Sequence, residues 1–330
     1  MIFFIGMNTF TFLLYGIDKN RAVQGGHRIS EGSLLMATFF FGGIGAALGM
    51  SIFKHKTQNR TFKIWRVIGV IIAIIPLIHV VEGMTLGRKI QYVEKDFYDS
   101  NWPEELNGYR IAFMTDLHSI SDEAMAEVVA ELNERSLDLV VLGGDFADYN
   151  RTAPHYQGTI RELSKLNAVD GVFGVEGNHD NYHSLFAMME QYGIVPLDNN
   201  GVQIRDGFYL AGVEDLWNRN PDVARAISGA ASDDFILLLT HNPDVSMQQS
   251  TEGIGLILAG HNHGGQITIF GFPIILLFGL TSDYGIRFAH GFNYSADGVP
   301  VFTSRGSGPY YNNPRIFARP EVVIFTMWNE

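Results

Sequence analysis

Four apolar runs in the second half of the chain each end in a polar cluster, and this alternation most constrains the fold. The runs occupy residues 111–114, 137–142, 236–239 and 254–259. Runs of this length are typical of strands that are buried on both faces of a parallel sheet. Such sheets collect their ligands at the carboxyl ends of the strands. We therefore expect the clusters to converge in space, although nearly 150 residues separate the first from the last.

The residue types in the clusters indicate a two-metal phosphoesterase. Two divalent cations about 3.5–4 Å apart need a carboxylate that bridges them, with neutral imidazole and carboxamide ligands around it. Each cluster alone is a weak signal, because Asp-x-His and Gly-Asp are common by chance. A histidine after a buried strand is more often a core residue. The joint pattern supplies the full set of ligand types in five clusters: Asp116-Leu117-His118, Gly144-Asp145, Gly177-Asn178-His179-Asp180, His241 and Gly260-His261-Asn262-His263.

With these motifs, residues 110–325 resemble the calcineurin-like metallophosphoesterase superfamily. The flanks Gly-His-Asn-His-Gly-Gly-Gln-Ile at 260–267 and Ser-Arg-Gly at 304–306 are similar to its membrane-associated bacterial branch, which is related to UDP-diacylglucosamine pyrophosphohydrolases. The resemblance implies an α/β fold, a four-layer α/β/β/α sandwich of two facing sheets flanked by helices. Helices are also expected from apolar spacing at residues 124–132, with Ser121 as the N-cap, and at 184–192 and 221–227.

The resemblance also implies a role for each site residue. The first metal would be held by Asp116, His118 and His263, and the second by Asn178, His241 and His261. Asp145 would bridge the two ions. His179 would lie beside the phosphate as a catalytic residue, and Asp180 would orient it. The mixed oxygen and nitrogen ligands suit manganese, iron or zinc, and the sequence does not choose among them.

The first 84 residues differ from the rest in charge and hydropathy. They contain eight Lys or Arg and three acids, a net charge of +5, whereas the remainder carries −17. Three apolar segments predict about three transmembrane helices at 2–15, 33–53 and 67–81, of which only the second has the roughly 20 residues needed to cross a bilayer. Buried core helices are the alternative. We expect a transmembrane module at 1–84, a surface linker at 85–108 and the catalytic domain at 109–330.

The loop between the second and third segments predicts the orientation. It carries Lys54, Lys56, Arg60, Lys63 and Arg66 within thirteen residues that include no acid. Short basic loops stay in the cytoplasm, so the third segment would lead outward and place the catalytic domain outside the cell membrane. With three spans, however, the basic residues at 19, 21 and 28 would also face outward, against the same rule.

The front of the chain resembles a second family. Residues 8–66 are similar to a small bacterial membrane-protein family of unknown function, through Tyr15-Gly16-Ile17-Asp18-Lys19, Arg28-Ile29-Ser30-Glu31 and the segment 53–57. This family brings no known activity. Its charged residues are equally consistent with a binding site and with anchors at the membrane interface.

An apolar run after the last cluster bears on the substrate. Residues 270–280 read FGFPIILLFGL, and they predict either a buried strand and turn or an apolar lip, with Ile275 and Leu276 at its centre, that touches lipid. The acidic balance of the second half disfavours nucleic acid. We expect a multi-pass, membrane-anchored hydrolase of phosphodiester or pyrophosphate bonds in a lipid-linked substrate. The alternatives are a soluble nucleotide-like substrate, or a membrane scaffold or transport module with a regulatory phosphoesterase.

Overall fold

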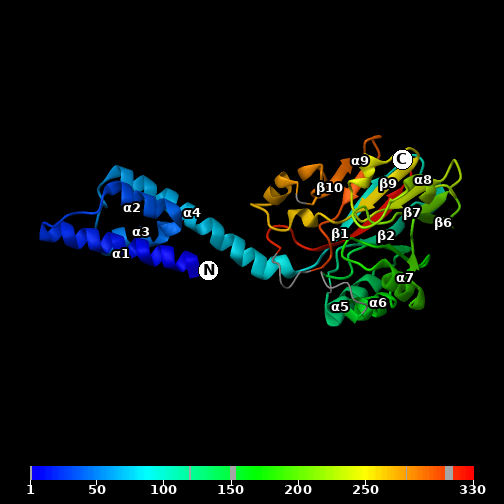
Figure 1. The fold of residues 1–330 in the computed structure, drawn as a ribbon, viewed down its shortest axis with the longest axis horizontal. Helices are drawn as coiled ribbons and strands as arrows, with labels where there is room; N and C mark the ends of the chain where they lie inside the picture. Colours follow the sequence, from blue (N-terminus) through cyan, green and yellow to red (C-terminus); the bar gives the residue numbers. More distant parts are fainter. Residues whose placement is uncertain (1, 119, 149–153, 280, 309–314) are drawn as a thin grey trace. The chain divides into compact units, whose positions relative to one another are not determined.

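The computed structural model of the protein (Figure 1) describes residues 2–118, 120–148, 154–279, 281–308 and 315–330. The chain divides into two compact units, Met1–Glu82 and Gly83–Glu330. The smaller unit is helical. The larger unit contains the strands, and all five polar clusters of the sequence lie in it.

One sheet of the larger unit is built around four parallel strands, β2 to β5. Its spatial order is β1-β12-β2-β3-β4-β5. Strand β12 runs antiparallel to β2 and parallel to β1. The strands are β1 (Gln91–Tyr98), β2 (Tyr109–Met114), β3 (Leu139–Gly143), β4 (Val172–Val175), β5 (Val195–Pro196) and β12 (Glu321–Trp328).

The second sheet faces the first and has the order β10-β11-β9-β8-β7-β6. Its four central strands are parallel, and β10 and β6 pair antiparallel at the two edges. The strands are β6 (Asn200–Arg205), β7 (Phe208–Gly212), β8 (Phe235–Leu239), β9 (Ile254–Ala259), β10 (Gly291–Tyr294) and β11 (Pro300–Thr303).

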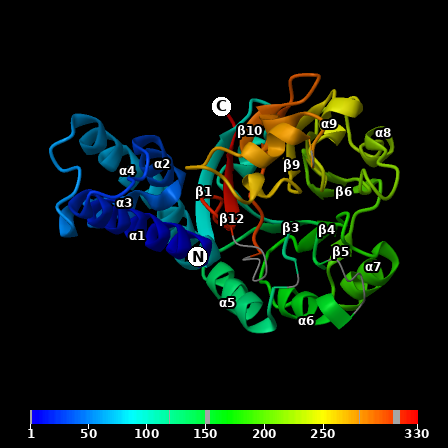
Figure 2. The same ribbon diagram turned by 60° about the vertical axis from the view of Figure 1, so that its left-hand side comes forward.

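The two-residue period of the strands separates the core into layers. In β2, Ile111 and Phe113 pack between the sheets, whereas Ala112 and Met114 face the helices. Figure 2 shows helices on the outer side of each sheet, which completes the expected four-layer α/β/β/α sandwich. Those helices are α5 (Asp122–Asn133), α6 (Pro154–Leu163), α7 (Tyr182–Gln191), α8 (Val223–Ala226) and α9 (Val245–Gln248).

Local capping sets where the predicted helices begin. The Ser121 hydroxyl accepts a hydrogen bond from the Ala124 amide at 3.2 Å, as expected for the N-cap of α5. Helix α7 starts two residues earlier than predicted, because the Asn181 side chain caps it. Helix α8 is shorter than predicted and is capped by Asp222, so Pro221 lies outside it.

The predicted linker at 85–108 is wrong over residues 91–98, which form the edge strand β1. This strand pairs with β12 along its whole length. Only one of its side chains, Phe97, is buried, and charged residues at 94–96 give the segment the appearance of a surface loop. The parallel partner lies more than 200 residues away in sequence, so no local pattern indicates the pairing.

The smaller unit contains α1 (Ile2–Gln24), α2 (Glu31–Ala37), η1 (Thr38–Gly42), α3 (Gly43–Ile52) and α4 (Arg60–Thr85). Among the described residues, two helical segments have the length and hydropathy of a membrane span, Glu31–Ile52 and Arg60–Arg88. Helix α1 is 23 residues long but is less apolar, because polar residues follow position 17.

The expected span at 33–53 is not a single straight helix. Phe40 (φ −77°, ψ 67°) and Phe41 (φ 60°) leave the helical conformation. The chain then reverses, and Lys56 Nζ reaches Glu31 Oε1 at 2.5 Å. Helices α2 and α3 therefore form a hairpin whose two ends lie together. This reversal cannot be predicted from the apolar run 33–53, since hydropathy carries no information on the direction of the chain.

A truncation series tests the boundary of the larger unit. We expect a fragment of residues 84–330 to be soluble and to unfold cooperatively. A fragment of residues 99–330 should aggregate, because losing β1 exposes the edge of the apolar strand β12. Size-exclusion chromatography and thermal unfolding measure both properties. Equal behaviour of the two fragments would contradict a structural role for β1.

Candidate metal centre

The candidate site lies at one edge of the two sheets, where parallel strands end. Asp116 and His118 follow β2, Asp145 follows β3, and Asn178 follows β4. From the facing sheet, His241 follows β8, and His261 and His263 follow β9. The two sheets thus bring all seven predicted ligands to the same edge, as expected for the carboxyl ends of parallel strands.

The backbone at this edge is unusual. Left-handed conformations, with φ between 44° and 71°, occur at five of the seven candidate ligands: Asp116, His118, Asp145, His261 and His263. Each such residue costs about 1–3 kcal/mol, and sites of function are where proteins retain that cost. The loop that contains Gly177 lies very close to Asp145. Only glycine fits there, because a Cβ atom at position 177 would lie 2.3 Å from Asp145 Oδ1.

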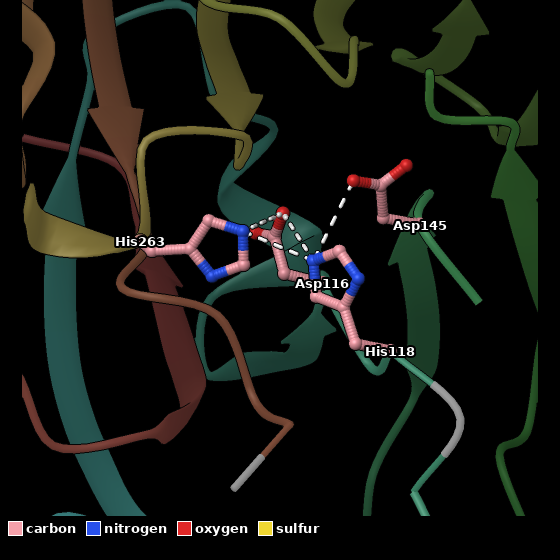
Figure 3. Close-up of side chains that lie close together, drawn as sticks. All are labelled: Asp116, His118, Asp145 and His263. Atoms are coloured by element: carbon pink, nitrogen blue, oxygen red, sulfur yellow. Dashed lines mark hydrogen bonds and ion pairs between the residues drawn. The ribbon is translucent and has the colours of Figure 1, made fainter. Parts of the chain in front are cut away.

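Four of the side chains form a first group, drawn in Figure 3. Asp116, His118, Asp145 and His263 each offer a ligand atom, and these atoms lie within 4.8 Å of one another. His118 Nε2 is 3.0 Å from His263 Nε2 and 3.6 Å from Asp145 Oδ2. Asp116 Oδ1 lies 3.6 Å from His263 Nε2.

The remaining three ligands form a second group beside the first. Asn178 Oδ1 is 3.1 Å from His241 Nε2 and 2.9 Å from His261 Nδ1. Asp145 joins the groups, since the same Oδ2 atom that lies near His118 is 3.3 Å from His241 Nε2. Asp145 thus occupies the position that a bridging carboxylate requires.

Hydrogen bonds behind the ligands fix the direction of two imidazole rings. His241 Nδ1 donates to the Gly143 carbonyl at 2.7 Å, and His261 Nε2 donates to the Thr281 carbonyl at 2.9 Å. The other nitrogen of each ring therefore presents a lone pair to the second group. Metal-binding histidines are held in this way in most proteins, which fixes both tautomer and orientation.

Burial keeps three of the histidines neutral. It lowers the pKa of His118 to about 4 and of His261 to about 3, and it lowers the pKa of His263 well below its usual value. Burial raises the pKa of Asp116 to about 6. At Asp145 burial acts in the same direction, but His241 and the neighbouring imidazoles outweigh it and lower the pKa. At His241 burial lowers the pKa, but Asp145 outweighs it and raises that pKa well above its usual value. Three neutral imidazoles beside an ionised aspartate suit cation binding, whereas His241 would release its proton when a cation binds.

The donor set fits divalent cations. His118 Nε2 and His263 Nε2 face each other at 3.0 Å, and His241 Nε2 and His261 Nδ1 at 3.3 Å. Donor atoms gathered this closely can share a cation. The carboxylates of Asp116 and Asp145 are also fully buried, which is costly without a compensating charge.

The two predicted catalytic residues lie beside the ligands and differ in role. The His179 amide donates to Asp145 Oδ1 at 2.8 Å, and its ring centre is 5.3 Å from that of His118. The buried Asp180 carboxylate accepts hydrogen bonds from the amides of Gly177 and Ala147, each at 2.9 Å. These bonds give Asp180 a role in holding two ligand loops together, which the sequence pattern did not indicate.

Two residues near the ligands were not in the predicted site. The buried Arg315 guanidinium places Nη2 3.2 Å from His263 Nδ1. The Trp217 ring lies edge-on to His261, with centroids 4.4 Å apart. Neither residue belongs to a motif, and each reaches the site from a loop distant in sequence. No local signal could therefore have identified them.

Comparisons with known proteins show the family of this chain. A family model described as calcineurin-like phosphoesterase matches residues 109–265. An uncharacterized metallophosphoesterase of Bacillus subtilis, YkuE, is 32% identical over 251 residues, which cover 72% of this chain and 85% of the relative. The chain belongs to the metallophosphoesterase family. It is accordingly a metal-dependent phosphoester hydrolase, and the side chains described above are its candidate ligands.

Other relatives of this metallophosphoesterase include one that is named as a transmembrane protein. A Danio rerio protein named as a transmembrane protein with metallophosphoesterase domain is 29% identical over 67% of this chain and 53% of its own length. A metallophosphoesterase of Campylobacter jejuni, Cj0846, is 26% identical over 83% of this chain and 72% of its own. A second family model, for a protein of unknown function (DUF1294), matches residues 8–62.

Metal binding should raise the stability of this metallophosphoesterase. A cation that binds only the folded state adds about 2.7 kcal/mol at 100 times its dissociation constant. We expect added Mn²⁺ or Zn²⁺ to raise the unfolding temperature and a chelator to lower it. Asp145→Asn should abolish the increase and reduce the bound metal measured by mass spectrometry. The exposed Asp206→Asn is the matched control, and an Asp145→Asn protein with full metal content would refute the shared-ligand geometry.

Proposed function

We propose that this chain is a membrane-anchored, dinuclear phosphoesterase that hydrolyses a phosphodiester or pyrophosphate bond of a lipid-linked substrate. The observation that carries the lipid assignment is an exposed apolar segment directly after the last ligand loop. The basic segment at 54–66, which includes the start of α4, supports a catalytic unit outside the cytoplasmic membrane, since basic residues beside membrane helices stay inside.

The two groups of ligands support one cation each. In this assignment Asp116, His118 and His263 hold the first ion, and a second set holds the other, with Asp145 shared: Asn178, His241 and His261. Manganese, iron and zinc all accept such mixed oxygen and nitrogen donors. The shared Oδ2 atom of Asp145, near one histidine of each group, is the strongest support for two ions rather than one.

The cations, His179 and Asp180 have different roles in the proposed reaction. The cations, when bound, supply Lewis-acid polarisation of the phosphate and the acidity that generates the nucleophile from water. The backbone amide of His179 donates a hydrogen bond to Asp145, which holds the partly exposed residue beside the phosphate position. There it stabilises developing charge or gives a proton to the leaving oxygen. Asp180 accepts hydrogen bonds from the amides of Gly177 and Ala147, and so it connects the loop after β4 with the loop after β3.

Exposed apolar side chains extend from the predicted run 270–280 back to Ile267, and the segment 267–278 has the properties of a lipid-contacting lip. Its short helix η5 (Ile274–Phe278) buries Leu276 at 2% exposure, whereas many of its neighbours are exposed. The exposed fractions are Ile267 42%, Ile269 49%, Phe270 57%, Phe272 49%, Leu277 56% and Phe278 73%. This pattern disfavours the alternative of a buried strand and turn. It also makes Leu276 an internal anchor rather than a contact residue.

Both ends of the lip are connected to the loop that contains His261 and His263. It begins four residues after His263, and beyond its far end the Thr281 carbonyl accepts the hydrogen bond from His261. Apolar area costs about 25 cal/mol per Å² in water, and clustered exposed aromatic residues mark interaction surfaces. A bilayer would cover this surface, and a phosphate ester at that boundary would then lie next to the ligands.

Substitutions at the site test the chemistry with a soluble chromogenic phosphodiester. Asp145→Ala and His261→Ala should abolish turnover while the unit stays folded. His179→Ala should lower the rate about 10²- to 10⁴-fold, the usual contribution of a proton-transfer group, and should keep the metal content. Loss of metal from His179→Ala would place this residue among the ligands and remove its proposed role.

Substitutions in the lip test the substrate class. We expect Phe270→Asp with Phe278→Asp to weaken hydrolysis of a lipid-linked phosphodiester or pyrophosphate in vesicles more than that of the soluble ester. Val169→Asp changes a similarly exposed apolar residue, 71% exposed, outside the lip, and serves as the control. Equal loss on both substrates would remove the lipid assignment and favour a soluble nucleotide-like substrate.

A further inference from the structure

The smaller unit contains an apolar segment that does not run in one direction. Helix α2 has 7 residues and α3 has 10, so at 1.5 Å per residue they rise about 10 and 15 Å. The hydrocarbon core of a bilayer is about 30 Å thick. Neither limb can cross it, whereas α1 with 23 residues and α4 with 26 can.

Contacts with α1 give the direction of each limb. Near the start of α1, Asn8 meets Gly45 at the beginning of α3. Further along, Tyr15 meets both Thr38 of η1 and Gly49 of α3. The α3 helix therefore runs parallel to α1. The α2 helix runs the opposite way, because its N-terminal flank is near Asp18 and its end is near Thr11.

Asp18 holds the two ends of the hairpin together. Its buried carboxylate accepts hydrogen bonds from the Ile29 amide at 2.9 Å and from Arg28 Nη2 at 2.7 Å, just before α2. His55 Nε2, just after α3, lies 2.7 Å from the same carboxylate. The Lys56 to Glu31 ion pair adds a second connection. The loops on either side of the segment therefore lie at the same end of the unit.

Side chains of α1 form hydrogen bonds with three backbone groups at or beside the turn of the hairpin. The Asn8 side chain donates to the Phe41 carbonyl at 2.9 Å and accepts from the Gly45 amide at 2.9 Å. Thr11 Oγ1 donates to the Ala37 carbonyl at 3.3 Å. Non-helical backbone is tolerated within a membrane only where protein groups satisfy it in this way. Asn8 and Thr11, in the largely apolar first half of α1, thus have a specific role.

We propose that residues 31–52 are a re-entrant hairpin, which enters and leaves the bilayer at one face, so that only α1 and α4 cross the membrane. All eight Lys and Arg residues of the unit then lie at that single face, because three are in the loops that flank the hairpin and five are in the adjoining ends of α1 and α4. Three spans would instead divide them between opposite faces. Basic residues near membrane helices gather on the cytoplasmic side, where anionic lipids attract them. The hairpin therefore removes the conflict over residues 19, 21 and 28.

Single cysteines test this topology in the full chain, which contains none of its own. Gln24→Cys and Gln58→Cys sample the two charged loops, and Asp206→Cys samples the catalytic unit; all three positions are exposed. The probe is a membrane-impermeant maleimide, applied to spheroplasts before and after permeabilisation. We expect Cys at 24 and at 58 to be labelled only after permeabilisation, and Cys at 206 to be labelled before it.

The outcomes separate this inference from the proposed function. Labelling of positions 24 and 58 from opposite sides would overturn the hairpin and restore a third span. Labelling of both from outside would support the hairpin and overturn the proposed location of the catalytic unit. The hydrolysis assays above do not depend on either result, since the inference rests only on membrane insertion of residues 1–82.

A second measurement tests the turn itself. Asn8→Leu leaves the Phe41 carbonyl and the Gly45 amide without their partner, so the unfolding temperature of the detergent-solubilised chain should fall. Thr9→Leu, at the neighbouring exposed position of α1, should leave it unchanged. If residues 31–52 formed a straight span, Asn8→Leu would only add apolar area, and an unchanged or raised unfolding temperature would contradict the hairpin.

Discussion

The carboxylate of Asp145 is the interaction on which the catalytic unit depends. One of its oxygens lies within 3.6 Å of a histidine from each half of the site, and the other accepts the amide of His179. These contacts join β3 to the loops after β2, β4 and β8, so that both sheets meet at one group. Because this charge is fully buried, the site requires positive charge around it. Cation binding and folding of this edge are consequently linked.

Strained backbone and close glycine contacts occur at the edge of the sheets where the candidate ligands lie. The left-handed conformations of the five ligands lie just beyond the last residues of the strands. The well-packed core between the sheets supplies the stability that holds these conformations in place. A rigid scaffold with strained loops is the arrangement that fixes ligand positions before a substrate arrives.

The membrane unit uses polar contacts for a different purpose. Asn8, Thr11 and Asp18 are polar side chains on one helix, and each one bonds a segment that would otherwise leave backbone or charge unsatisfied in an apolar surrounding. Glycines allow the helices to approach closely, since a Cβ at Gly43 would lie 1.9 Å from the backbone of Gly69. These hydrogen bonds and close glycine contacts, rather than hydropathy alone, therefore specify how the helices of the unit pack.

The sequence by itself determined the strands that precede four of the five clusters, the cap of α5 and the family, and it supplied the residues that we propose as metal ligands. These features depend on local patterns of apolar, glycine and chelating residues, which act over a few positions. Only the tertiary structure decided that β1 is a strand, that Asp180 braces two loops, that Arg315 and Trp217 reach the site, and that the segment 31–52 turns back on itself. Each of these depends on partners brought together from distant parts of the chain, and a linear pattern carries neither direction nor proximity.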